Sequence, residues 1–199
     1  MTVRRVIYFL GILFILTTAG AGTSAADSGY PQALRAHLTR IRGMLVSIVA
    51  AMPEDKYDFR PTKEVRSFRE MVEHLIGDIY SHAGYVMGKS RAESEKIAEQ
   101  NTKGIKTRAE YLKAMGEAFD YGDKMLAGIT DENAMDTVTA MRGAKTTRVE
   151  AALQLFEDEM DHYGNFVVYL RLNGVVPPDT TENLQRLKEQ KEQQNHDHH

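Results

Sequence analysis

The stretch V-E-A-A-L-Q-L-F-E-D-E-M-D-H-Y-G-N-F-V-V-Y-L-R-L-N-G-V-V-P-P, residues 149–178, decides the fold. Its apolar residues recur at steps of four and three, as in an amphipathic helix that packs against other helices. Asn173 and Gly174 end this helix, and the two prolines after them are expected to prevent it from restarting. The spacing predicts a long helix over 147–172 in an antiparallel bundle. The apolar residues with this spacing are Val149, Leu153, Phe156, Met160, Tyr163, Val167 and Leu170.

Three more amphipathic segments precede this helix, and the sequence shows no useful length of β-alternation. The first opens with Pro31, a residue suited to the first turn of a helix. The second opens with Ser67, followed three residues later by Glu70, the pair that forms a capping box. With the last helix, these segments predict an all-α fold, a four-helix bundle. They are residues 31–52, 67–88 and 107–129.

The segments between and after the predicted helices are polar. We expect surface connections at 89–106 and 130–145. The tail is rich in Gln, Lys and Glu, and we expect either a short solvated helix or a flexible segment. Its end, H-D-H-H, is interpreted as a flexible end, with metal scavenging and an expression-tag remnant as alternatives. The expected organisation is a bundle at 27–178 and a polar tail at 179–199.

Residues 1–26 have the pattern of a secretory signal peptide. Arg4 and Arg5 form a basic start, residues 6–16 are an apolar run, and small residues follow up to Ala26. A retained membrane anchor is the alternative, but the run is shorter than the roughly 20 residues of a spanning helix. We therefore expect cleavage, export to the periplasm or the cell exterior, and no stable membrane anchor afterwards.

Charge and cysteine content limit the classes of function. Of 25 Lys and Arg, Arg4 and Arg5 fall in the leader, which leaves 23 against 28 Asp and Glu. This mildly acidic balance argues against a nucleic-acid surface. The absence of cysteine excludes disulfides and a lipid-modified cysteine. Any metal must therefore be held by nitrogen and oxygen ligands.

Two predicted helices carry ionisable residues at helical spacing. Asp158 and His162 are four residues apart and therefore lie one turn apart on one face. His74, Asp78 and His82 recur at the same spacing on the second helix. If the two helices face each other, His74 joins Asp158 and His162 in a three-ligand site for a divalent cation, with positions open for water or substrate.

Other polar residues have different expected roles. Asp78 and His82 are expected to lie outside the ligand set, either orienting ligands or facing solvent. Glu159 falls near the centre of the apolar arc, where it either orients a ligand histidine or reaches the end of the bundle. His37 is assigned a structural role. For Asp158 and its neighbouring histidine, the alternative to a metal site is a buried ion pair.

Two stretches resemble a known family, the DinB-like (DinB/YfiT-type) helical bundles. The stretch M-P-E-D-K-Y-D-F-R-P-T-K-E-V-R-S-F-R-E-M-V-E-H-L, residues 52–75, resembles that family's first loop and second helix. The stretch D-H-Y-G-N-F-V-V-Y-L-R-L-N-G-V-V-P-P, residues 161–178, resembles its fourth helix. The match covers nearly the whole chain after the leader. It implies a four-helix bundle, often dimeric, with a divalent cation in a pocket at one end.

Carried over residue by residue, the resemblance gives ligand roles to His74 and His162. The family usually has a third histidine four residues before the second of these, and Asp158 stands there instead. Aspartate is a ligand for zinc, nickel, iron and manganese. The exchange therefore either alters the metal preference or marks a site that has lost its metal. Zinc is the cation we expect, with nickel, iron and manganese as alternatives.

The resemblance also limits the expected activity. Characterised relatives include metal-dependent thiol transferases, thiol-dependent isomerases and a hydrolase-like group. We therefore expect a metal-dependent hydrolase or transferase with an unidentified small-molecule ligand. Export argues against transfer of intracellular thiols and favours hydrolysis or sequestration. The alternative is a non-catalytic bundle with a degenerate metal site, acting as a binding or structural module. A homodimer is a further expectation, with Tyr111, Met115, Tyr121 and Met125 as either dimer face or core.

Overall fold

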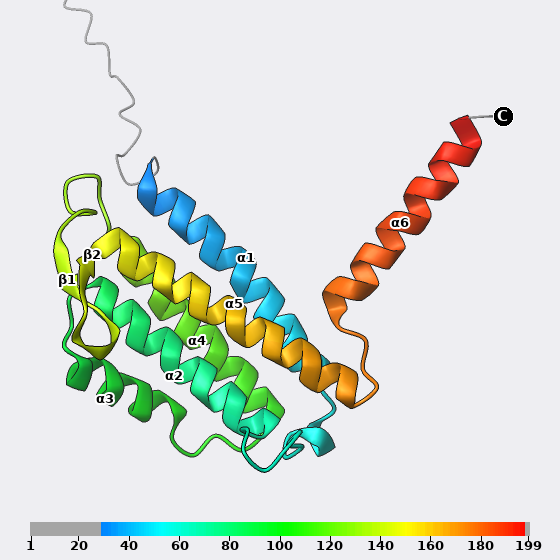
Figure 1. Cartoon of the computed structure of the whole chain (residues 1–199), viewed down its shortest axis with the longest axis horizontal. Helices are drawn as coiled ribbons and strands as arrows, with labels where there is room; N and C mark the ends of the chain where they lie inside the picture. Colours follow the sequence, from blue (N-terminus) through cyan, green and yellow to red (C-terminus); the bar gives the residue numbers. More distant parts are fainter. Residues whose placement is uncertain (1–28, 198–199) are drawn as a thin grey trace, which may run out of the picture.

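The computed structural model describes residues 29–197, and the expected signal peptide at 1–26 lies outside them. Four long helices in the described part lie alongside one another (Figure 1). The expectation of an all-α chain is confirmed by this arrangement. The four helices are α1 (Tyr30–Ala51), α2 (Phe68–Val86), α4 (Arg108–Leu126) and α5 (Arg148–Leu172).

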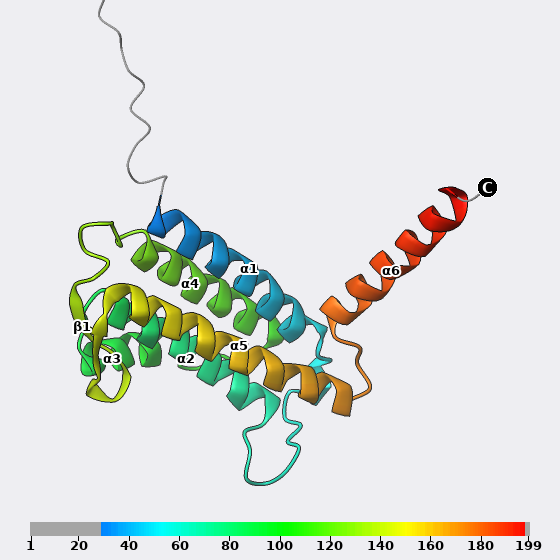
Figure 2. The same cartoon turned by 45° about the horizontal axis from the view of Figure 1, so that its top comes forward.

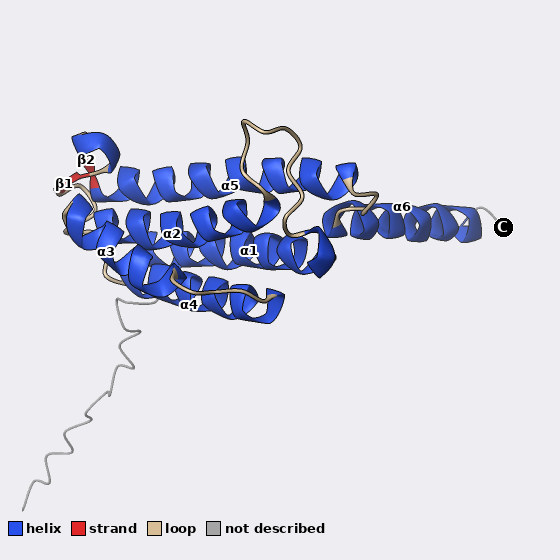
Figure 3. Cartoon of the chain, turned by 90° about the horizontal axis from the view of Figure 1, so that it is seen from below, coloured by secondary structure: helices blue, strands red, loops and turns tan. Residues whose placement is uncertain are grey.

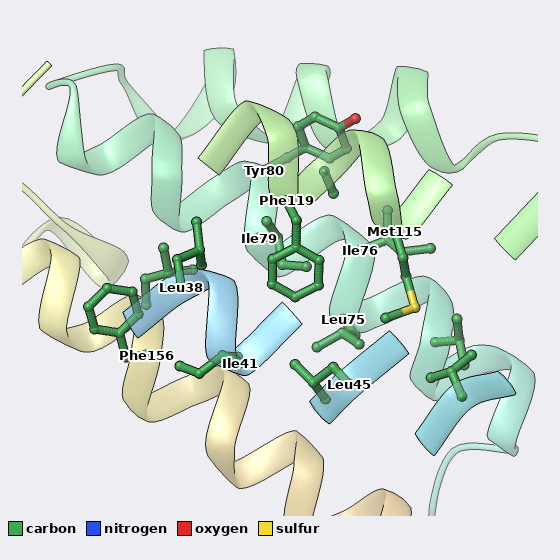
Figure 4. Close-up of a cluster of buried hydrophobic side chains, with 14 of the residues drawn as sticks. Leu38, Ile41, Leu45, Leu75, Ile76, Ile79, Tyr80, Met115, Phe119 and Phe156 are labelled. Carbon is green, nitrogen blue, oxygen red and sulfur yellow. The ribbon is translucent and has the colours of Figure 1, made fainter. Parts of the chain in front are cut away.

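The core lies between these four helices. Helices α1 and α2 each pack against both α4 and α5, and the rotated view in Figure 2 shows the layers they form. Figure 4 shows side chains from all four helices meeting in one apolar cluster. Tyr111 and Met115, which we weighed as a dimer face, are fully buried in this core. Labelled members of the cluster are Leu38, Ile41, Leu45, Leu75, Ile76, Ile79, Met115, Phe119 and Phe156.

The capping box predicted at the start of α2 is confirmed. The Ser67 hydroxyl accepts a hydrogen bond from the Glu70 backbone N–H at 3.2 Å, and the Glu70 carboxylate accepts from the Ser67 N–H at 2.7 Å. The same reciprocal pair opens α4, with Thr107 and Glu110. Each box satisfies backbone donors that a helix leaves free at its first turn, which fixes where these helices begin.

The segment expected to be a surface connection at 89–106 contains a further helix, α3 (Arg91–Thr102). It buries Ser94 and Ala98 and packs against α2. Gly84 of α2 allows the close approach, because a Cβ there would overlap the Ser94 hydroxyl. The prediction missed α3 because its apolar stripe is too narrow to give a helical pattern.

A small β-hairpin begins in the segment expected to be a loop at 130–145 and ends at Thr147, beyond that segment. Strands β1 (Thr137–Thr139) and β2 (Lys145–Thr147) pair antiparallel, with Val138 opposite Thr146. Short 3-10 turns occur at Glu54–Lys56 and at Met141–Gly143. Strands of three residues are too short to show the alternation on which a sequence prediction relies.

The tail forms a helix, α6 (Pro178–Asp197). A helix is one of the two structures expected for the tail, and it begins at the second of the two prolines that were expected to keep the preceding helix from restarting. Pro178 is the first residue of α6, where its missing N–H breaks no helical hydrogen bond. The Tyr163 hydroxyl ties the start of α6 to α5 by donating to Asp179 at 2.7 Å. Beyond this, α6 extends away from the other helices (Figures 1 and 3).

Between residues 29 and 197, no helix combines enough length with enough apolar character to cross a membrane.

The buried face of α5 differs from the predicted one. Leu153, placed in the apolar seam by its spacing, is 42% exposed. Leu155, Glu159, His162 and Phe166 are buried instead. The predicted seam follows apolar residues alone, so it includes Leu153 and leaves out His162, whose imidazole points inward. Glu159 is buried, as its place near the centre of the apolar arc predicts. Ionisable side chains therefore occupy the interior of this helix packing.

Candidate metal centre

Helices α2 and α5 pack side by side and run in opposite directions, and their interface positions the site. On α2, His74, Asp78 and His82 point from three successive turns. On α5, His162 lies beside the first two of these, and Asp158 lies beside His82. We call these five residues the α2–α5 seam. Their order along the two helices follows directly from the four-residue spacing and the antiparallel packing.

Three residues of the seam share one point. The Asp78 Oδ2 atom lies 3.1 Å from His74 Nε2 and 3.2 Å from His162 Nε2. The centroids of the two imidazole rings are 5.0 Å apart, and the rings meet edge to face. Ligand atoms from these three residues all lie within 4.8 Å of one another. The structure thus brings together the two histidines to which the sequence assigned ligand roles.

The positions of the two aspartates differ from those that the sequence predicted. Asp78, expected to lie outside the ligand set, contacts both histidines of the central group. Asp158, expected to be a ligand, lies beside that group, with its Oδ2 atom 3.4 Å from His162 Nε2 and 3.7 Å from His82 Nε2. The signal that pointed to Asp78 was its four-residue spacing from His74. One sequence does not show how far α2 is rotated toward α5.

The seam is buried at one side and open at the other. The side chains of His162 and His82 are 8% and 5% exposed, while those of His74 and Asp158 are 31% and 30% exposed. The side chain of Asp78 is 19% exposed. Water therefore reaches the seam along the edge formed by His74 and Asp158, while the two inner histidines are shielded.

The seam has the chemistry and spacing of a divalent-cation site. Bonds of about 2.1 Å to nitrogen and oxygen place tetrahedral ligands roughly 3.4 Å apart, and the contacts around Asp78 and His162 fall near that separation. Within residues 29–197, Asp158 Oδ2, His82 Nε2 and both Glu159 oxygens are buried with no hydrogen-bond partner. Leaving such a group unpaired costs about 1–3 kcal/mol. A cation would satisfy Asp158 Oδ2 directly.

The charges of the metal-free seam are uneven. Burial lowers the pKa of the His162 imidazole, but the Asp158 and Asp78 carboxylates beside it outweigh burial and raise that pKa to about 10. Burial also lowers the pKa of His82 and of His74, and there the neighbouring carboxylates do not reverse it. At neutral pH, His162 is therefore protonated between two aspartates, and the other two histidines are neutral.

Glu159 lies beside the seam and is completely buried. Its side chain is 0% exposed, and complete burial raises the pKa of its carboxyl well above the usual range. His162 opposes that rise, whereas Asp158 and Asp78 add to it. The sequence expectation that Glu159 lies at the centre of the inward face agrees with its complete burial. Its oxygens lie close enough to the seam to interact with both aspartates.

The protonation of His162 makes the metal-free protein sensitive to alkaline pH. A pKa raised on folding adds stability that is complete below the unfolded value of about 6.5 and is lost as pH rises through about 10. We expect the free energy of unfolding of the metal-free protein to fall between pH 7 and 9.5, measured by urea denaturation in EDTA. His162→Gln removes this slope and His37→Gln, on α1, retains it. An equal slope in both variants would contradict the assignment.

Comparisons with other proteins identify the family and the fold. The family model described as the DinB superfamily matches residues 37–165, a range that includes the whole seam. A DinB-like protein from Bacillus subtilis has 20% sequence identity and a TM-score of 0.58, over 71% of this chain and 92% of its own. A candidate DinB-family member from Exiguobacterium sibiricum has 18% identity and a TM-score of 0.60, over 74% of this chain and 93% of its own. No curated protein matches the sequence. On the extent of the family match, the chain belongs to the DinB superfamily.

Proposed function

We propose that this protein binds one divalent cation at His74, Asp78 and His162, with Asp158 as a further ligand. The observation that carries the proposal is the position of Asp78 Oδ2, at 3.1 and 3.2 Å from the Nε2 atoms of histidines on two different helices. Two imidazoles and one or two carboxylates suit zinc, and also nickel, iron and manganese. We place zinc first and assign the four packed helices the role of a four-helix-bundle scaffold.

The activity that this site supports is metal-dependent hydrolysis or group transfer on a small molecule. A bound divalent cation lowers the pKa of a coordinated water toward neutrality. The protein contributes ligands from two rigid helices, and packing shields His162 on its inner side. The exposed edge at His74 and Asp158 gives a water or a small ligand access. The proposal includes export to the periplasm or the cell exterior, as the signal-peptide pattern of residues 1–26 predicts, and assembly as a homodimer, as the family resemblance implies.

A second candidate is a non-catalytic binding or structural module. The observation favouring it is that the metal-free seam is already partly neutralised, because a protonated His162 lies between Asp78 and Asp158. Such an ion pair holds α2 and α5 together without a metal. The two candidates differ in whether the seam takes up a cation in place of this proton.

Equilibrium dialysis against zinc tests the proposal. The measurement uses the full chain with His196, His198 and His199 replaced by serine, because these terminal histidines would bind zinc themselves. We expect zinc to bind this protein, and Asp78→Ala and His162→Ala each to weaken its affinity at least tenfold. The matched control is Asp161→Ala, which removes an exposed aspartate next to His162 on the same helix.

Two results separate the candidates. Zinc affinity that stays the same in Asp78→Ala and His162→Ala, with both variants folded by circular dichroism, contradicts the proposed site. If zinc binds as expected, hydrolysis of chromogenic esters and phosphates is compared in wild type and His162→Ala. Turnover that needs both zinc and His162 supports an enzyme, and zinc binding without turnover of any of them favours the binding module.

A further inference from the structure

One histidine of the seam has no role in the proposed site. His82 lies one turn beyond Asp78 on α2, and its Nε2 atom points toward Asp158 Oδ2 at 3.7 Å. Its ring also meets the Tyr85 ring edge to face, with centroids 6.0 Å apart. The contact with Asp158 is longer than a hydrogen bond. His82 and Asp158 therefore face each other as two ligand atoms, without bonding to each other.

We propose that the seam holds a second divalent cation, bound between His82 Nε2 and Asp158 Oδ2 beside the first position. The inference rests on the proposed function, because Asp158 is shared between the two positions. The loaded protein then carries a dinuclear centre along the α2–α5 seam. The central position has His74, Asp78 and His162, and the inner position has His82 and Asp158, with Glu159 adjacent.

Burial of His82 is the first argument. The residue is 4% exposed, and its Nε2 atom has no hydrogen-bond partner in the described part of the chain. Native interiors rarely leave such a nitrogen unpaired. The Asp158 oxygen that it faces is also buried, and its 3.4 Å contact with His162 Nε2 is an ion pair without hydrogen-bond geometry. The unpaired nitrogen and the carboxylate oxygen have the donor types and nearly the separation of two ligands on one cation.

The position of Asp158 is the second argument. Its Oδ2 atom lies 3.4 Å from His162 Nε2 and 3.7 Å from His82 Nε2, so one carboxylate faces a histidine of each position. A carboxylate placed between two sets of ligands can bridge two divalent cations.

A dinuclear centre also narrows the proposed activity. Carboxylate-bridged ions about 3.5–4 Å apart stabilise both the attacking and the leaving oxygen of a displacement. Helical bundles build such centres from histidines and carboxylates on facing helices. The second position therefore favours hydrolysis of a phosphate or carboxylate ester over transfer of a thiol.

Manganese is the probe for this inference, because two coupled Mn(II) ions differ from one in electron paramagnetic resonance. The full chain with His196, His198 and His199 replaced by serine is dialysed against MnCl₂, and bound metal is counted. We expect two ions per chain and an exchange-coupled spectrum. His82→Leu is expected to bind one ion and to give the six-line spectrum of isolated Mn(II). The matched control, His37→Leu, makes the same exchange on α1 and is expected to retain both ions.

Metal-free stability shows whether His82 is merely structural. Leucine at position 82 removes an unsatisfied buried nitrogen, so the EDTA-treated variant is expected to melt no lower than wild type. His82→Asn serves as a second variant if His82→Leu does not fold. One ion in both wild type and His82→Leu overturns the second position and leaves the proposed function intact. Two ions retained in His82→Leu overturn the assignment to His82, and no bound metal in wild type overturns both proposals.

Discussion

Saturating zinc is expected to raise the melting temperature of the metal-free protein by about 8–16 °C. A ligand present at a thousand times its dissociation constant stabilises the folded state by about 4 kcal/mol. For a domain of this size, each kcal/mol corresponds to roughly 2–4 °C. The Asp78 oxygen between two histidines provides a preformed site that the unfolded chain lacks. Scanning calorimetry with zinc and then with excess EDTA measures the shift.

The control for this shift is a variant that lacks the three terminal histidines. The chain with His196, His198 and His199 replaced by serine is expected to show the full shift, because α6 contributes nothing to the seam. Asp78→Ala in that background should lose most of it, and Asp161→Ala should keep it. A melting-temperature shift near zero in the protein with an unsubstituted seam would favour the non-catalytic module. In that module, His162 stays protonated between its two aspartates.

Phe166→Ala is expected to destabilise the protein by about 3–5 kcal/mol, as truncation of a fully buried aromatic ring does. Phe166 is 0% exposed and lies one helical turn after His162 on α5. Its ring meets that of Phe68 of α2 at 5.2 Å between centroids. Phe68 in turn contacts Tyr57 at 5.0 Å. This aromatic cluster packs between the two helices that carry the candidate metal ligands.

The effect should therefore appear in two measurements. Urea denaturation gives the loss of stability, and equilibrium dialysis is expected to show zinc affinity reduced at least tenfold, because the α2–α5 spacing relaxes. Val168→Ala, at a position on α5 that is 53% exposed, is expected to change stability by no more than about 0.5 kcal/mol. Wild-type zinc affinity in folded Phe166→Ala would show that the aromatic cluster does not position the ligands.

The sequence predicted the fold well where local chemistry determines it. Ser67 and Glu70 mark the first turn of α2, because a capping box depends only on residues close together in the chain. The prediction failed for α3, whose buried residues are the small Ser94 and Ala98. It also failed at Pro178, where a residue that ends helices begins one. In both cases the local pattern was compatible with more than one structure.

The candidate site was harder to predict, because it depends on how two helices face each other. Spacing alone placed His74 and His162 on compatible faces. It did not separate the roles of Asp78 and Asp158, since either aspartate lies four residues from a histidine. The rotation of α5 shows the same limit, because His162 turns inward where an apolar count favoured Leu153. Packing against α2 decides these orientations, and the local pattern of a single sequence does not reveal how two distant helices pack.

The distance along the chain between the two halves of the seam has a consequence for how the protein forms. Asp78 and His162 are 84 residues apart. Closing so long a loop costs several kcal/mol of chain entropy, and the cost rises only slowly with length. No short peptide from either helix can reproduce the complete seam. Uptake of the ion should therefore follow assembly of the helices, and the rate at which a nascent chain acquires metal reports the completion of its tertiary structure.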